Sequence, residues 1–167
     1  MKTAQIISLI TAAFIILMSS SGYAAKPDER WADYTQWTKI HNLPITGDHT
    51  GFLGGLHQAK KGYRQVFVND IGVATSLGSA PYKYPIGTVI AKEQYKNLAA
   101  FEKGKKPGLT IMVKISDDAA NPADNWEWSR GYTKKAKQKD AFCSGCHTIA
   151  IQKDFVFSNA TSLKSFQ

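Results

Sequence analysis

Apolar and polar residues alternate in the middle of the chain, and this alternation predicts β-strands at four places. Tyr63–Asn69 and Thr88–Tyr95 are rich in aromatic and β-branched residues, and each follows a glycine. Leu109–Ile115 follows a proline–glycine turn, and Trp126 begins a further strand that runs towards Tyr132.

Side chains of a strand point alternately to its two faces, so each predicted strand has two chemically different sides. In the second strand the two sides carry Thr88, Ile90 and Lys92, and Val89, Ala91 and Glu93. In the third strand they carry Thr110, Met112 and Lys114, and Leu109, Ile111, Val113 and Ile115.

Helices are predicted around these strands. Over Asp28–Leu43 an aromatic or apolar residue recurs every three positions, at Trp31, Tyr34, Trp37 and Ile40, and Pro44 ends the run. Ile71–Leu77 predicts a short helix, and the glycine-rich stretch Asn42–Gly62 predicts a loop. A segment with Lys134, Lys135, Lys137 and Lys139 is also expected to be helical. These elements predict an α+β fold, a mostly antiparallel β-sheet with flanking helices.

The N-terminus has the pattern of a secretory signal peptide over residues 1–24. Lys2 precedes an apolar run, Ile6 to Met18, and small residues then lead to Ala24. An uncleaved membrane anchor is the alternative, although the run is short for a span of about 20 residues. Residues 25–167 then form one domain, and we expect a periplasmic location.

Cys143-Ser-Gly-Cys-His147 is the sequence that carries chemistry. Two thiols three residues apart lie on one side of a helical turn, where they can add to two vinyl groups of one porphyrin. His147 then offers an imidazole to the iron. This is the attachment pattern of c-type haem, so we expect one covalent haem c near the C-terminus, held by Cys143 and Cys146 with His147 as the metal ligand. The alternatives are a redox-active pair, a structural disulfide and half of a zinc site.

No methionine follows His147, although a downstream methionine is the usual sixth ligand of small cytochromes c. Met112, on a predicted strand, is more typical of packing. Three further histidines exist, His41, His49 and His57. We therefore expect a five-coordinate iron with an open sixth position.

Several blocks together resemble the cytochrome P-460 family, which is related to the cytochromes c′-beta. They are Tyr63–Asn69, Tyr84–Glu93, Leu109–Lys114, Asn121–Trp128 and Cys143–His147 followed by Asp154–Phe157. The resemblance implies an antiparallel sheet, a five-coordinate haem with His147 proximal, and oxidation of hydroxylamine or nitric oxide. It also implies that Lys92 is cross-linked to the porphyrin, the alternative being an exposed strand lysine.

At one position the residue differs from that of the hydroxylamine-oxidising members of the family. The resemblance places their distal carboxylate at Thr110, which is not a base at neutral pH, and leaves Glu93, Glu102 and Asp117 as substitutes. A pocket lined by Phe67, Leu109 and Ile111 would instead resemble a non-catalytic protein that binds nitric oxide or transfers electrons. Whether the chain is an enzyme thus stays open at this point.

The net charge and the distribution of lysines bear on which partners the protein binds. The chain has 167 residues and a formal net charge of +8, with lysines gathered before the cysteines and at Lys103, Lys105 and Lys106. Both groups are typical of a solvated surface, and export argues against nucleic acid. We expect a small ligand or substrate, hydroxylamine or nitric oxide, and a redox partner protein. An exposed sheet edge would also allow a homodimer.

Overall fold

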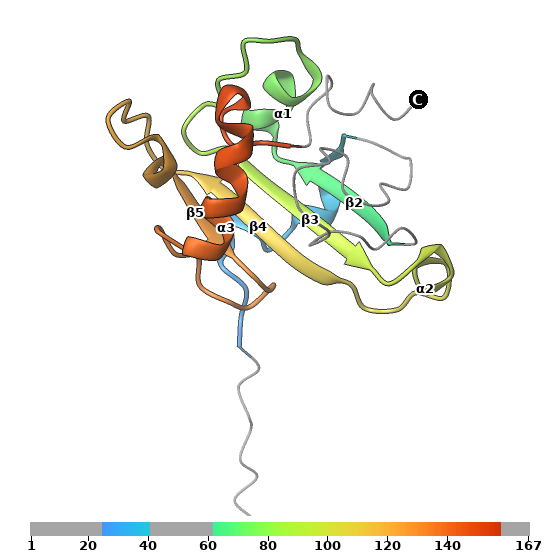
Figure 1. The fold of residues 1–167 in the computed structure, drawn as a ribbon. Coiled ribbons are helices and arrows are strands. Elements are labelled where there is room, and N and C mark those ends of the chain that lie inside the picture. Colours follow the sequence, from blue (N-terminus) through green and yellow to red (C-terminus); the bar gives the residue numbers. More distant parts are fainter. Residues whose placement is uncertain (1–24, 41–61, 158–167) are drawn as a thin grey trace, which may run out of the picture.

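A computed structural model describes residues 25–40 and 62–157 of the chain. The predicted signal peptide, the predicted loop apart from Gly62, and the histidines His41, His49 and His57 lie outside these residues. Within them, five strands form one antiparallel sheet in chain order, β1 to β5 (Figure 1). The strands are β1 Thr38–Lys39, β2 Tyr63–Val68, β3 Val89–Tyr95, β4 Gly108–Lys114 and β5 Trp126–Ser129.

Helices lie at the ends and on the faces of the sheet. The α-helices are α1 Asp70–Leu77, α2 Leu98–Glu102 and α3 Ala141–His147. The 3₁₀-helices are η1 Glu29–Trp31, η2 Tyr34–Gln36, η3 Pro122–Asn125 and η4 Thr148–Lys153. The predicted α+β fold is thus confirmed. None of the helices in the described residues has the length and apolar character needed to cross a bilayer.

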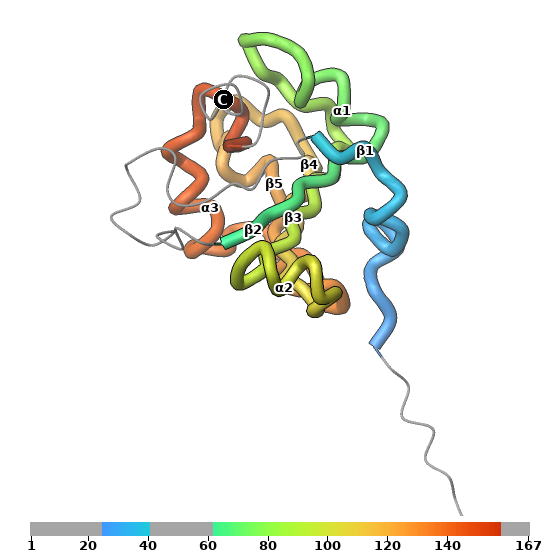
Figure 2. The backbone as a smooth tube through the Cα atoms, turned by 90° about the vertical axis from the view of Figure 1, so that its right-hand side faces the viewer, coloured from blue at the N-terminus to red at the C-terminus, as the bar shows by residue number. Residues whose placement is uncertain are grey.

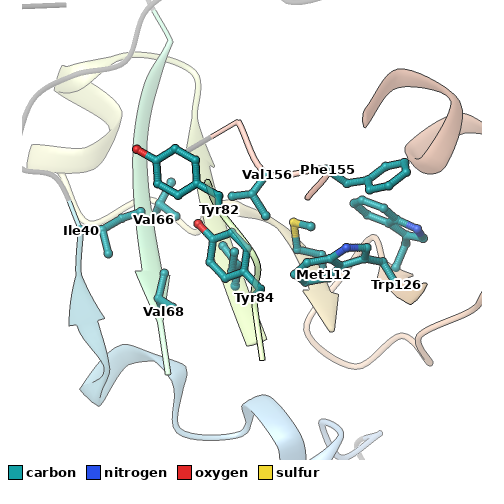
Figure 3. Close-up of a cluster of buried hydrophobic side chains, with 11 residues drawn as sticks. Ile40, Val66, Val68, Tyr82, Tyr84, Met112, Trp126, Phe155 and Val156 are labelled. Carbon is teal, nitrogen blue, oxygen red and sulfur yellow. The ribbon is translucent and has the colours of Figure 1, made fainter. Parts of the chain in front are cut away.

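Each face of the sheet packs a separate hydrophobic cluster, as the predicted alternation requires. One cluster includes Phe67, Val89, Ala91, Leu109, Ile111 and Val113, covered by Trp31 and Tyr34. The other includes Val66, Val68, Ile90, Met112, Trp126 and Trp128, covered by Tyr82, Tyr84, Phe155 and Val156 (Figure 3). Viewed from the side, the N-terminal segment and α3 lie on opposite sides of the sheet (Figure 2).

The helix predicted over Asp28–Leu43 is wrong over Asp28–Ile40, the part of it that the structure describes. The segment instead forms the two 3₁₀ turns η1 and η2, and then extends into β1, which pairs with the end of β2. A repeat of three residues matches the 3.0 residues per turn of a 3₁₀-helix better than the 3.6 of an α-helix. Trp31 and Tyr34 are nevertheless buried, so the pattern identified the buried face correctly.

The lysine-rich segment is not helical either. Lys137 instead forms an isolated bridge with Trp128, and Lys139 has a φ of 54°, in the left-handed region. Lys135 and Lys139 would be one turn apart in a helix, where like charges repel. The strand that begins at Trp126 ends at Ser129, before Tyr132, while the other predicted strands and the Ile71–Leu77 helix are confirmed within one residue.

Gly72 allows α1 to approach the sheet. A methyl group there would collide with Thr88 Cγ2 and lie 2.9 Å from Val68 Cγ1.

We expect Gly72→Ala to lower the free energy of unfolding by about 1 to 3 kcal/mol, because the collision forces neighbours out of place. Thermal melting of the holoprotein measures the loss. Gly108→Ala, whose methyl would lie 3.7 Å from Gln94 O, is the control. Equal melting temperatures for the two variants would contradict this packing.

Candidate haem site

A cavity of about 400 Å³ lies between the sheet and α3. Its floor is one face of the central strands, and its other walls come from β5, α3 and the residues after η4. The floor residues are Arg64, Val66, Ile90, Lys92, Gln94, Thr110, Ile111 and Met112. The walls are Trp128, Ser129, Phe142, Cys143, Cys146, His147, Val156 and Phe157. The volume falls within the usual range for a small-molecule or cofactor site.

Both cysteines and the histidine of the motif line this cavity from one short helix. Asp140 caps α3, because its carboxylate accepts a hydrogen bond of 3.0 Å from the backbone N–H of Cys143. Cys143 and Cys146 are three residues apart and therefore share a face of the helix. His147 is the last residue of α3, so the helix ends where the imidazole enters the cavity wall.

A backbone carbonyl decides which ring nitrogen of His147 carries the proton. Nδ1 lies 2.6 Å from the carbonyl oxygen of Phe155. A carbonyl only accepts, so Nδ1 must donate its proton, which leaves the lone pair on Nε2. This is the arrangement usual for a metal-bound histidine, whose other nitrogen donates to the protein. The rings of Trp128 and Phe157 flank the imidazole, at centroid distances of 4.5 and 4.9 Å.

The surroundings of Cys143 do not suit a redox-active thiol. Burial raises the pKa of this thiol to about 11, and the nearby Asp140 carboxylate adds to the rise. A reactive cysteine of a Cys-x-x-Cys redox motif instead needs a lowered pKa, because the thiolate is the nucleophile. The alternative of a redox-active pair is therefore disfavoured.

Lys92 lies on the cavity floor, on the same face as the motif. It stands between Val66 and Thr110 in the sheet register and is only partly exposed. Burial, together with the positive charge of the Arg64 guanidinium, lowers the pKa of its amine to about 8. The amine is then mostly protonated at pH 7, but its neutral fraction is larger than that of an ordinary lysine, and only a neutral amine is a nucleophile. The alternative of a fully exposed strand lysine is wrong.

Two floor residues, Arg64 and Gln94, were not predicted from the sequence. They face each other in the register of β2 and β3, and Gln94 Nε2 donates a hydrogen bond of 3.3 Å to Thr110 Oγ1. Arg64 is 8% exposed, and burial lowers its pKa. The alternation of side chains along the strands could have identified both residues, because Arg64 shares a face with Val66 and Gln94 shares one with Lys92.

The carboxylates considered as distal bases lie elsewhere. Glu93 points to the other face of the sheet, where it accepts hydrogen bonds of 2.8 Å from Tyr34 and Tyr95. Asp117 pairs with Lys83 at 2.6 Å, and Glu102 is exposed in α2. Among the described residues, no Asp or Glu lines the cavity.

The apolar part of the floor also differs from expectation. Phe67, Leu109 and Ile111 belong to the cluster on the opposite face, although Ile111 also lines the cavity. The apolar floor residues that belong to the cluster beneath the cavity are Val66, Ile90 and Met112. Met112 is buried among Tyr84, Trp126 and Val156 (Figure 3), where its thioether packs.

The residues present fit a porphyrin with acidic side groups. Trp128 is 4% exposed and lines the cavity, and its Nε1–H has no acceptor among the described residues. Buried N–H groups normally have a partner, so this one marks a place for an acceptor on a bound group, such as a propionate. Cys143 and Cys146 would attach the haem, and His147 Nε2 would bind its iron.

Comparison with known proteins identifies the family of the chain. The family model described as Cytochrome P460 matches residues 31–158. The match begins at Trp31 and ends after Phe157, so it includes every strand described above and all residues of the cavity. The resemblance inferred from the sequence is thereby confirmed. No curated protein matches the chain.

We expect the peptide that contains both cysteines to carry haem. Cys143→Ser and Cys146→Ser should each leave one thioether, and the double variant should leave none on that peptide, because serine does not add to a vinyl group. Mass spectrometry of proteolytic fragments measures this, with Ser144→Ala as a control that keeps both bonds. Two unmodified thiols in the holoprotein would contradict the assignment.

Proposed function

Because the chain belongs to the cytochrome P460 family, we propose that it is a periplasmic haem oxidoreductase that oxidises hydroxylamine or nitric oxide. The haem would be bound covalently, one per chain, with five-coordinate iron. The observation that carries the proposal is the position of Lys92 on the floor of the cavity that Cys143, Cys146 and His147 also line. A redox partner protein would accept the electrons.

The bound haem would supply a redox-active iron with an open coordination position. The chain's own residues would provide binding and orientation. Thr110 accepts from Gln94 and keeps its own O–H to donate to a small polar ligand. The positive charge of Arg64 lies at the same end of the floor and favours electron-rich oxygen atoms. Val66, Ile90 and Met112 make the rest of the floor apolar.

A second candidate function is binding without turnover, either nitric oxide capture or electron transfer of the c′-beta type. The observation that favours it is the lack of a carboxylate among the described cavity residues. Positioned general bases typically contribute about 10² to 10⁴ in rate. Anaerobic turnover of hydroxylamine with an artificial electron acceptor supports the first function. Binding of nitric oxide with no turnover of either substrate supports the second.

We expect haem to be bonded to Lys92 as well as to the cysteines. Fragment mass spectrometry should find porphyrin on the Lys92 peptide, and the ferrous Soret band should be red-shifted from that of an ordinary c-type haem. Lys92→Arg keeps a cation at the position but forms no such bond, so its Soret band should return to the ordinary wavelength. An unmodified Lys92 peptide in the holoprotein would remove the main support for the enzyme.

Thr110→Glu should increase hydroxylamine oxidation. The new carboxylate would stand beside Lys92 in the register of β3 and β4 and act as a general base, so the expected gain in kcat is about 10² to 10⁴. Thr110→Gln has the same shape without the base and should show no gain. Steady-state kinetics under anaerobic conditions compare the three proteins. An equal rate for the two variants would exclude a missing base as the limiting factor.

A further inference from the structure

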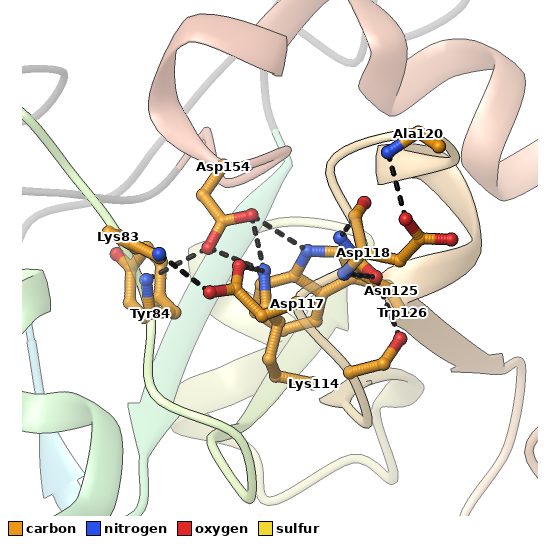
Figure 4. Close-up of polar contacts among 10 residues, drawn as sticks. Lys83, Tyr84, Lys114, Asp117, Asp118, Ala120, Asn125, Trp126 and Asp154 are labelled. Atoms are coloured by element: carbon orange, nitrogen blue, oxygen red, sulfur yellow. Dashed lines mark hydrogen bonds and ion pairs between the residues drawn. The ribbon is translucent and has the colours of Figure 1, made fainter.

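A buried ion pair links the end of the sheet to the segment after η4. The ammonium of Lys114, at the end of β4, lies 2.7 and 2.8 Å from the two carboxylate oxygens of Asp154 (Figure 4). The Lys114 side chain is 1% exposed and that of Asp154 is 13% exposed. Replacing such a pair by apolar residues is often neutral or stabilising, because desolvation offsets the attraction. Stability alone is therefore a weak reason for its presence.

Asp154 is fixed from two further directions. Its carboxylate accepts a hydrogen bond of 2.8 Å from the backbone N–H of Tyr84 and one of 3.4 Å from Trp126 Nε1 (Figure 4). Tyr84 precedes β3, and Trp126 begins β5. One carboxylate thus joins three parts of the chain to the segment that follows η4.

The backbone at this point has an uncommon conformation. Asp154 and Phe155 have φ values of 51° and 65°, both in the left-handed region that non-glycine residues rarely adopt. Two such residues in succession reverse the chain, and surrounding contacts must hold them there. The carboxylate of Asp154 supplies those contacts, and the buried side chain of Phe155 anchors the second residue.

The next group along this chain of contacts is the carbonyl of Phe155, which accepts the hydrogen bond from His147 Nδ1 at 2.6 Å. We propose that Lys114 and Asp154 are positioning residues for His147, holding the Phe155 carbonyl where it fixes the orientation and tautomer of the imidazole. This inference rests on the proposed binding of haem iron by His147. A strong hydrogen bond at Nδ1 makes the ligand more basic, which favours ferric iron.

The test compares holoproteins of the wild type, Asp154→Asn and the double variant Lys114→Met/Asp154→Asn. Asparagine still tolerates the left-handed region. The double variant removes one positive and one negative charge, so the net charge stays the same. We expect a higher reduction potential and a lower iron–histidine stretching frequency in both variants. Asp117→Asn is the matched control, since Asp117 lies 3.9 Å from Lys114 Nζ but pairs with the exposed Lys83.

The possible outcomes distinguish a failure of the positioning role from a failure of the proposed haem attachment. Wild-type potential and frequency in the double variant, with only a changed melting temperature, would mean a purely structural role and overturn the inference. A wild-type protein without covalent haem would overturn the attachment and the inference together. If the double variant yields no holoprotein, Asp154→Glu takes its place. This variant keeps both charges and displaces the carboxylate by one methylene. We again expect a higher reduction potential and a lower iron–histidine stretching frequency.

Discussion

The alternation of side chains across β2, β3 and β4 divides the protein into two halves with different tasks. One face of these strands packs under the N-terminal segment and forms a closed hydrophobic cluster. The other face carries a second cluster and, beside it, the floor of the cavity. A shift of one residue in register would exchange these faces. It would move Lys92 and Thr110 into the closed cluster and bring Glu93 to the cavity, so the register decides the chemistry of the site.

The opposite wall of the cavity depends on a short, well-anchored segment. α3 has seven residues, too few for an isolated helix to be stable. It is held by the Asp140 cap at its start and by the contact between His147 and the Phe155 carbonyl at its end. The Lys114–Asp154 pair then ties this carbonyl to the sheet. The rigid sheet therefore supports both the floor of the cavity and the histidine on its wall.

Periodicity in the sequence was enough to predict the central strands, the helix after β2 and the faces on which Lys92 and Met112 lie. The spacing of the cysteines identified the motif. Two elements were predicted wrongly, the first helix and the lysine-rich helix, because a three-residue repeat does not by itself separate 3₁₀ from α geometry and because like charges oppose helix formation.

Other features depend on contacts between residues distant in sequence. The Phe155 carbonyl reaches His147 through a reversal of the chain. Asp154 meets Lys114 across 40 positions. No local pattern in a sequence encodes contacts over such separations, so the ion pair could not be predicted. Nor could the positions of Glu102 and Asp117 away from the cavity be predicted, whereas the alternation already placed Glu93 on the face opposite Lys92.

Substrate oxidation and nitric oxide capture both require one haem whose iron is bound by His147 and open on its other side. Electron paramagnetic resonance of the ferric holoprotein tests this most directly, since the spin state of the iron reports its coordination. We predict a high-spin signal, as expected for a five-coordinate iron with a single imidazole ligand. A purely low-spin signal would mean that a second strong protein ligand occupies the sixth position. That result would contradict both substrate oxidation and nitric oxide capture, because each needs an open iron.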